Sequence, residues 1–174
     1  MATKAETSRR STQADSSRNR RIIEGLTKSY WMEIETVQNY LANSVNLEGV
    51  RAKEIKESLG SDIEEELNHA RMLAERIHIL GGFVPGSFEF KPEQKSLQPP
   101  RDTTDLETVI VGVIESENGA IAQYQELIEL CDGVDYATQD LCIELMADEQ
   151  GHRREFVSFL AEFDVKKAEK YRSI

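Results

Sequence analysis

The sequence has few of the residues that would indicate a disulfide-stabilised or membrane-spanning protein. Its 174 residues include two cysteines and four prolines, and no stretch approaches the roughly 18 consecutive apolar residues that a membrane span requires. The N-terminus lacks the apolar core of a signal peptide. Cys131 and Cys142 show no metal-binding spacing, so we expect buried thiols in a reducing compartment. These absences predict a cytoplasmic protein with no membrane partner.

What the sequence does contain is typical of helices. Charged residues make up 30% of the chain, β-branched runs are few, and the length suits one domain with a substantial core. Residues 1–21 carry six basic and two acidic side chains, a net charge of +4, which leaves −15 for the rest of a chain whose total is −11. We therefore predict a basic, flexible N-terminal tail over residues 1–21 and a helical domain over residues 22–174.

Apolar periodicity predicts four helices in this domain. The first begins at Ile22, and the second ends at Gly81-Gly82. Residues 83–103 contain all four prolines and no sustained periodicity, which predicts a long crossover. A capping box that starts at Thr104 opens the third helix, and the fourth begins near Asp135. The fold class is therefore all-α, a four-helix bundle with one long crossover between the second and third helices.

Each predicted helix carries a glutamate within its apolar stripe, on the three- and four-residue steps that place side chains in the core: Glu33, Glu66, Glu117 and Glu149. Burying an isolated carboxylate is so unfavourable that four converging on one core imply a compensating positive charge. No Lys or Arg occupies those faces, so we expect a metal cluster. Other glutamates lie off the stripes and are expected to be hydrated: Glu35, Glu64, Glu115 and Glu126.

Two histidines follow a core glutamate by three residues, His69 after Glu66 and His152 after Glu149. Residues three apart on a helix are neighbours, so carboxylate and imidazole can reach one metal ion. The same spacing before His78 lies on roughly the opposite side of its helix, so we expect that histidine at the surface.

The pattern is repeated in two halves of the chain. In each half a glutamate precedes a tyrosine by seven residues, as in Glu33 and Tyr40 or Glu117 and Tyr124, and precedes an ExxH segment by 32 or 33 residues. Two such helix pairs supply the ligand set of di-iron and di-manganese carboxylate bundles. The alternative, solvated glutamates on an acidic bundle, would have to explain four core positions and two ExxH pairs together.

These residues resemble bacterioferritin and related ferritin-like proteins over roughly residues 22–163. The segments EEELNHARMLAERIHILGG (64–82) and MADEQGHRREF (146–156) look like the second and fourth helices of that family. The resemblance implies a ferritin-like bundle with two iron ions per subunit, at a site that would also accept manganese. In that family's arrangement, Glu33 and Glu117 would be terminal ligands and Glu66 and Glu149 would bridge the irons. His69 and His152 would each bind one iron.

The same resemblance carries further expectations. Tyr40 is expected to lie near the irons and lend an electron, although an aromatic at helical spacing also fits the core. Asp148 is a candidate for orienting a histidine. Leu67 replaces the methionine that clamps haem in bacterioferritin, so we expect no haem. Asp164–Ile174 leave little room for the fifth helix of 24-subunit shells, which favours a 12-subunit homo-oligomer.

The function implied by the resemblance is a di-iron ferroxidase that oxidises Fe(II) with O2 or H2O2 for iron storage and detoxification. Two alternatives stay open. A rubrerythrin-like peroxide reductase would turn over without storing iron, although the chain has no rubredoxin-type cysteine pairs. A DNA-protecting miniature ferritin would bind phosphates through the basic tail.

Overall fold

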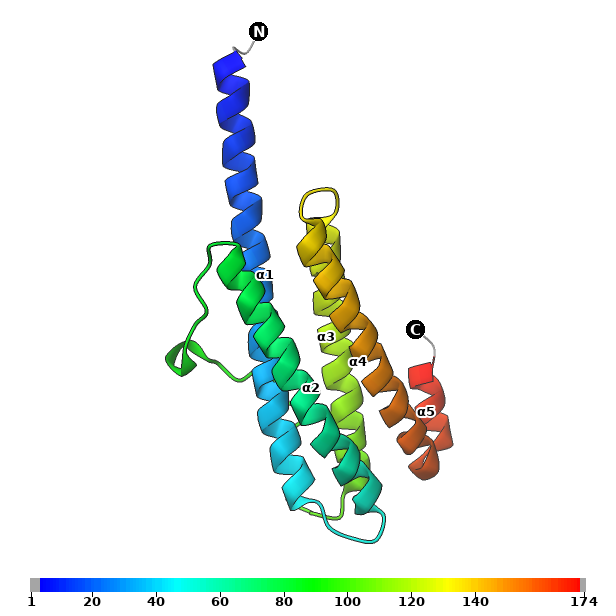
Figure 1. Cartoon of the computed structure of the whole chain (residues 1–174). Coiled ribbons are helices and arrows are strands. Elements are labelled where there is room, and N and C mark those ends of the chain that lie inside the picture. Colours follow the sequence, from blue (N-terminus) through cyan, green and yellow to red (C-terminus); the bar gives the residue numbers. More distant parts are fainter. Residues whose placement is uncertain (1–3, 173–174) are drawn as a thin grey trace.

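The computed structural model describes residues 4–172, with side chains from residue 16 onward. Figure 1 shows long helices that lie side by side. They are α1 (Lys4–Asn46), α2 (Ala52–Ile79), α3 (Leu106–Cys131) and α4 (Tyr136–Phe163), with a short η1 (Ser87–Glu89) in the crossover and α5 (Val165–Arg172) after α4. The prediction of an all-α, four-helix bundle with one long crossover is confirmed.

The bundle consists of two antiparallel hairpins. α1 packs along α2, α3 packs along α4, and the largest contact between the hairpins joins α1 to α3. The crossover leaves the end of α2 and runs back along the bundle to the start of α3 (Figure 1). The two hairpins correspond to the two halves of the repeat in the sequence.

Apolar side chains form two separate clusters, one toward each end of the bundle. One includes Leu59, Ile110 and Phe156, and the other includes Leu26 and Leu73. Burying each such side chain contributes about 1.5–3 kcal/mol to folding. Between the clusters, every helix of the bundle turns buried polar side chains inward. The polar layer in the middle is therefore supported by apolar packing on both sides.

Glu35 holds the crossover in place. It was predicted to be hydrated, but it is buried. Its carboxylate accepts hydrogen bonds from the backbone N–H groups of Glu93 and Gln94 at 2.9–3.0 Å. The side chain of Gln94 in turn donates to Thr36 at 2.6 Å and to Ser116 at 3.0 Å. A carboxylate satisfied by backbone donors explains how this position off the apolar stripe can be buried.

Two helix starts differ from prediction. α1 begins at Lys4 and not at Ile22, so the predicted tail has a helical backbone from Lys4 onward, and it projects past the other helices (Figure 1). The side chains of residues 1–15 lie outside the described part, and the division at residue 21 stays a prediction. The N-cap of α3 is Asp105, whose carboxylate accepts from the backbone N–H of Thr108 at 3.0 Å, so the predicted box at Thr104 is shifted by one residue.

The predicted lack of room for a fifth helix is wrong. Asp164 accepts a hydrogen bond from the backbone N–H of Lys167 at 3.0 Å, which caps the short α5. α5 packs on α4 and buries Ala168. A helix of this length fits into the remaining chain, so its expected absence no longer favours 12 subunits.

Cys131 and Cys142 are buried free thiols, as predicted. Burial raises the pKa of Cys131 to about 11 and that of Cys142 to about 12, so both stay protonated and unreactive at neutral pH. Among the described residues no helix is long and apolar enough to cross a bilayer.

Candidate metal centre

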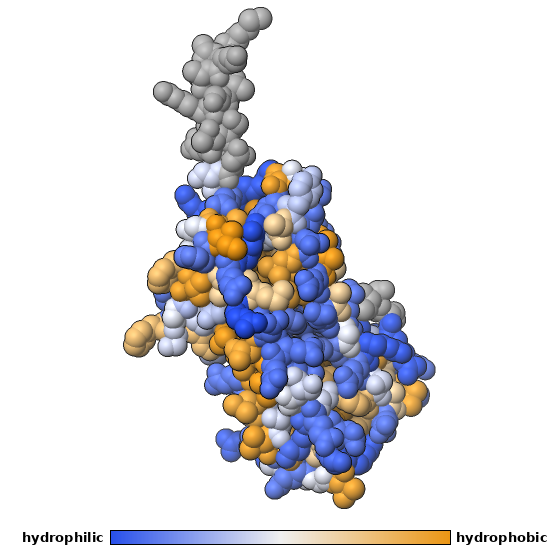
Figure 2. Space-filling model, in the orientation of Figure 1, coloured by the Kyte–Doolittle hydropathy of each residue, from blue (hydrophilic) through white to orange (hydrophobic). Residues whose placement is uncertain are grey.

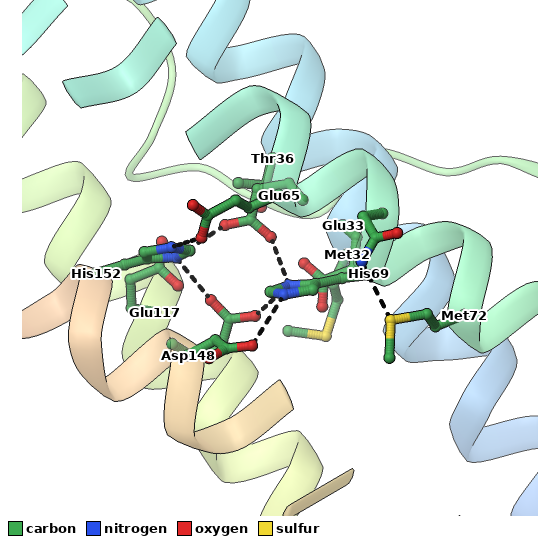
Figure 3. Close-up of polar contacts among 12 residues, drawn as sticks. Met32, Glu33, Thr36, Glu65, His69, Met72, Glu117, Asp148 and His152 are labelled. Atoms are coloured by element: carbon green, nitrogen blue, oxygen red, sulfur yellow. Dashed lines mark hydrogen bonds and ion pairs between the residues drawn. The ribbon is translucent and has the colours of Figure 1, made fainter. Parts of the chain in front are cut away.

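The glutamates of the four stripes and the two ExxH histidines meet in the polar layer between the apolar clusters. Each of the six side chains is at most 8% exposed. In Figure 3, His69 and His152 lie on opposite sides of a group of carboxylates, and the centroids of their rings are 6.3 Å apart. The structure thus brings together all six residues that the helical register selected, which are Glu33 (α1), Glu66 and His69 (α2), Glu117 (α3), and Glu149 and His152 (α4).

Glu66 and Glu149 lie between the two histidines. The Oε1 and Oε2 atoms of Glu66 are each 3.4 Å from an Nδ1 atom, that of His152 and that of His69 respectively. The corresponding oxygens of Glu149 are 3.1 Å from Nδ1 of His69 and 3.3 Å from Nδ1 of His152. Each of these carboxylates therefore offers one oxygen to each side, as a ligand that bridges two cations must.

Two overlapping groups of ligand atoms result. Glu33 joins the group on the His69 side and Glu117 joins the group on the His152 side, with the atoms of each group within 4.8 Å of one another. Glu66 and Glu149 belong to both groups. Four carboxylates carry four negative charges, which two divalent cations would balance. Carboxylate oxygen together with imidazole suits iron or manganese, so the residues present fit a di-metal centre.

Without cations, burial determines the protonation of the outer glutamates. Loss of hydration, followed by the charges of Glu149 and Glu66, raises the pKa of Glu33 and of Glu117 well above the usual range. Burial also works to raise the pKa of Glu149, but hydrogen bonds from the two histidines outweigh it and lower that pKa to about 2. The metal-free layer therefore holds protons on some of its carboxylates while others stay charged.

The histidines respond to the same carboxylates. Burial disfavours the charged form of His69, but its contacts with Glu149 and Glu66 raise its pKa to about 10. The pKa of His152 is raised by the same two partners. Protons on both rings thus take the place that cations would occupy.

A half-exposed carboxylate lies behind each histidine. Oε2 of Glu65 is 3.0 Å from Nε2 of His152, and Oδ2 of Asp148 is 3.5 Å from Nε2 of His69. Donation of Nε2–H to a carboxylate leaves Nδ1 free to face a metal. The sequence had suggested Asp148 for this position but not Glu65, although Glu65 precedes Glu66 as Asp148 precedes Glu149.

Two tyrosines connect the hairpins at the layer. The hydroxyl of Tyr40 donates to Glu117, and the hydroxyl of Tyr124 donates to Glu33. Burial, followed by the charge of the partner glutamate, raises the pKa of both tyrosines, so each remains a neutral donor. Tyr40 lies beside the site as expected. No role at the site had been predicted for Tyr124, although its position seven residues after Glu117 matched that of Tyr40 after Glu33.

Asp62 is a further buried carboxylate that the sequence prediction missed. It lies one turn before Glu66 on α2 and is 5% exposed, and its Oδ2 has no hydrogen-bond partner among the described residues. Burial raises its pKa to about 7, with the charge of His152 opposing the rise. Its neighbour Ile63 is only half-buried and packs against one of the apolar clusters.

The predicted surface positions are at the surface, apart from Glu35. His78 and Glu75 are exposed, so the third ExxH spacing does not contribute to the layer. The remaining glutamates predicted to be hydrated are also exposed: Glu64, Glu115 and Glu126.

Comparison with known proteins agrees with this architecture. The ferritin-like domain family matches residues 23–165. A bacterioferritin from Brucella melitensis is 31% identical over 138 residues, which cover 76% of this chain and 78% of that protein. A DNA protection during starvation protein from Pyrococcus furiosus is 27% identical over 143 residues, which cover 80% of this chain and 77% of the relative.

Two solved structures are similar in fold. A ferritin-like, diiron-carboxylate protein from Bacillus anthracis matches with a TM-score of 0.73 at 24% identity, over 82% of this chain and 97% of that chain. A dodecameric thioferritin, the bacterioferritin-related protein from Bacteroides fragilis, also gives 0.73, at 21% identity, over 91% of this chain and 96% of that chain. The sequence match over most of the domain, together with the shared fold, shows that this chain belongs to the ferritin-like domain family.

Proposed function

We propose that this protein is a di-iron ferroxidase, which oxidises Fe(II) with O2 or H2O2 and stores the product inside a homo-oligomeric shell. The observation that carries the proposal is the pair of ligand groups that share Glu66 and Glu149. The relatives named bacterioferritin support iron as the substrate. In this assignment the shared glutamates bridge two Fe(II) ions, Glu33 and Glu117 are terminal ligands, and the two histidines bind one iron each.

The chain's own residues would hold the substrate ions and exclude water. Bound Fe(II) supplies the electrons that reduce the oxidant. Glu65 and Asp148 keep Nδ1 of the histidines directed at the ions through their contacts with Nε2. Tyr40 and Tyr124 hold the terminal carboxylates through their hydroxyl groups. We further propose that Tyr40 lends an electron, because it is in direct contact with a terminal ligand.

The outer face of α1 and α2 supports assembly into a homo-oligomer. Figure 2 shows apolar patches on the surface of the molecule. Leu41, Val45 and Leu67 are exposed on these two helices, and a groove of about 520 Å³ between them is lined in part by Tyr30 and Ile34. Apolar surface of this kind is typical of a protein interface. Leu67 has no sulfur ligand, so the proposed assembly contains no haem.

The decisive experiment is an anaerobic Fe(II) titration of the metal-free protein, followed by addition of O2 or H2O2. We expect about two Fe(II) per chain, release of protons from the glutamates and histidines on binding, and then fast oxidation. Elemental analysis and sedimentation of the same sample should find iron retained in an oligomer. Binding without retained iron would favour the peroxide reductase over storage, and no stoichiometric binding would contradict the di-iron site.

DNA binding is a second candidate function. The basic residues Arg18, Arg20 and Arg21 are exposed on α1, whose N-terminal part projects past the other helices (Figure 1). A relative named for DNA protection points in the same direction. A gel-shift assay should detect salt-sensitive binding by the whole chain and none by a chain lacking residues 1–21. Equal shifts, or none, would remove this candidate.

A further inference from the structure

A cavity of about 470 Å³ lies between α4 and α5, and none of the six ligand residues lines it. The side chains that line it include three arginines and no acidic residue: Gln150, Arg153, Arg154, Val157, Tyr171 and Arg172. We call it the arginine cavity. In a chain with a net charge of −11, three guanidinium groups around one hollow with no acid in the lining form a local concentration of positive charge.

Arg153 is the fixed element of the arginine cavity. It is 6% exposed, and its hydrogen bonds go to neutral acceptors. Nε donates to Oδ1 of Asn118 and one terminal nitrogen donates to the carbonyl of Tyr171, both at 2.6 Å. A guanidinium stays charged in proteins and has five N–H donors, so these two bonds leave both charge and donors unused.

None of the three arginines forms an ion pair within the part of the chain that the structure describes. Arg154 and Arg172 are exposed, so they can move toward a ligand while Arg153 stays in place. Glu115 contacts the cavity lining, where it accepts a hydrogen bond from the hydroxyl of Tyr171 at 2.6 Å. That contact is with Tyr171 and not with a guanidinium group.

We propose that the arginine cavity binds a phosphate-type oxyanion from solution. Planar guanidinium forks pair with the oxygens of such an anion through two parallel hydrogen bonds, and charge-assisted bonds of this kind are about twice as strong as neutral ones. The buried charge of Arg153 gives the site a preformed attraction, and the two mobile arginines close on the anion. None of the six ligand residues lines the arginine cavity, although Gln150 and Arg153 directly follow Glu149 and His152 on α4. The proposal therefore does not depend on iron oxidation.

The test is a calorimetric titration of inorganic phosphate into the intact, metal-free oligomer at fixed ionic strength. The double variant R154Q/R172Q should lower the association constant at least about tenfold, because two charged forks are lost. The control K95Q/R101Q removes the same charge from two exposed basic side chains elsewhere and should stay within about twofold of the parent. R154K/R172K keeps the charge without the fork and should fall between them.

Arg153 is left unchanged in all these variants, because it anchors α5, and circular dichroism should show parent-like folding. Three outcomes would overturn the proposal: no phosphate binding by the intact protein, equal binding by R154Q/R172Q and the parent, or an equal loss in the control pair. Acetate binding as tight as that of phosphate would also overturn it, because the cavity would then select carboxylates and not phosphate-type anions.

Discussion

The two hairpins contribute the same kinds of side chain to the polar layer but surround them differently. Each supplies one glutamate that belongs to a single ligand group, one glutamate that belongs to both groups, and a histidine. Each also sends one tyrosine hydroxyl to the other hairpin. The position one turn before the bridging glutamate differs. In α2 it is the buried carboxylate Asp62, whereas in α4 it is the buried Leu145.

Because of this difference, the two halves of the ligand set need not bind cations with the same free energy. Asp62 lies close enough to His152 for their charges to affect each other, whereas Leu145 belongs to an apolar cluster. A cation on the His152 side therefore has one more carboxylate nearby than a cation on the His69 side. We expect the His152 side to bind the first cation more tightly.

The largest effect on Fe(II) oxidation should come from removing Glu66 or Glu149, the glutamates that belong to both ligand groups. Glu66→Ala or Glu149→Ala takes one ligand from both cations at once, so fast Fe(II) oxidation should fall by at least about 100-fold. Metal-free Glu149→Ala should stay folded with a lower Tm, because the hydrogen bonds from His69 and His152 that lower the pKa of Glu149 to about 2 are lost. Stopped-flow absorbance and thermal unfolding measure the two effects. Glu64→Ala, on the exposed face of the same helix, is the control, and a loss of oxidation in it would contradict the assignment.

The next largest effect should be on stability, at Asp62, the buried carboxylate of α2 that has no counterpart in α4. Folding raises its pKa from 3.8 to about 7, so its contribution to stability is fully present below about pH 4 and is lost as pH rises through about 7. Metal-free Asp62→Asn should therefore be more stable than the parent by roughly 2–4 kcal/mol at about pH 8, with the gain disappearing toward pH 4. Urea unfolding at several pH values measures this gain. Glu64→Gln should show no such trend, and a gain independent of pH would contradict the prediction.

A smaller difference is expected between the carboxylates behind the histidines. The contact of Glu65 with His152 is 3.0 Å and that of Asp148 with His69 is 3.5 Å, so Glu65→Gln should weaken metal binding more than Asp148→Asn. Loss of such a partner typically costs about 10–100-fold in affinity. Anaerobic Co(II) titration, followed through the visible absorbance of the bound ion, measures each variant. Equal losses would show that the difference in distance has no energetic consequence.

The smallest effect should come from the tyrosines. Tyr124→Phe removes one buried hydrogen bond to Glu33, worth about 1 kcal/mol, and should slow oxidation about fivefold. Tyr40→Phe removes the matching bond to Glu117 and should slow oxidation further if Tyr40 also lends an electron. Single-turnover oxidation rates compare the two variants. Unchanged kinetics in Tyr124→Phe would show that the hydrogen bond from Tyr124 to Glu33 does not contribute to oxidation.

Helical register was sufficient to select the six residues that meet in the layer. A glutamate such as Glu117, on steps occupied by apolar neighbours, must face the core wherever the helix lies. Register does not say which residue of another helix stands opposite. The contacts of Tyr124 with Glu33 and of Glu65 with His152 cross between helices, so their partners could be recognised only from the packing.

The other features that the sequence did not predict correctly also have local structural causes. Asp62 was missed because an aspartate is expected to prefer water. The start of α1 was misplaced because apolar periodicity marks only the packed part of a helix. Its earlier residues include good helix formers such as arginine. α5 buries only Ala168, so it has almost no apolar stripe to detect.

The position of the polar layer between two apolar clusters has a consequence for how the empty protein opens. Helices usually fray from their ends, but here the ends are held by apolar packing. The middle of the metal-free bundle holds buried carboxylates whose charges repel one another. Local opening should therefore begin at the centre of α2 and α4 when metal is absent. Amide hydrogen exchange would be fastest there in the empty protein and would slow sharply once cations bind.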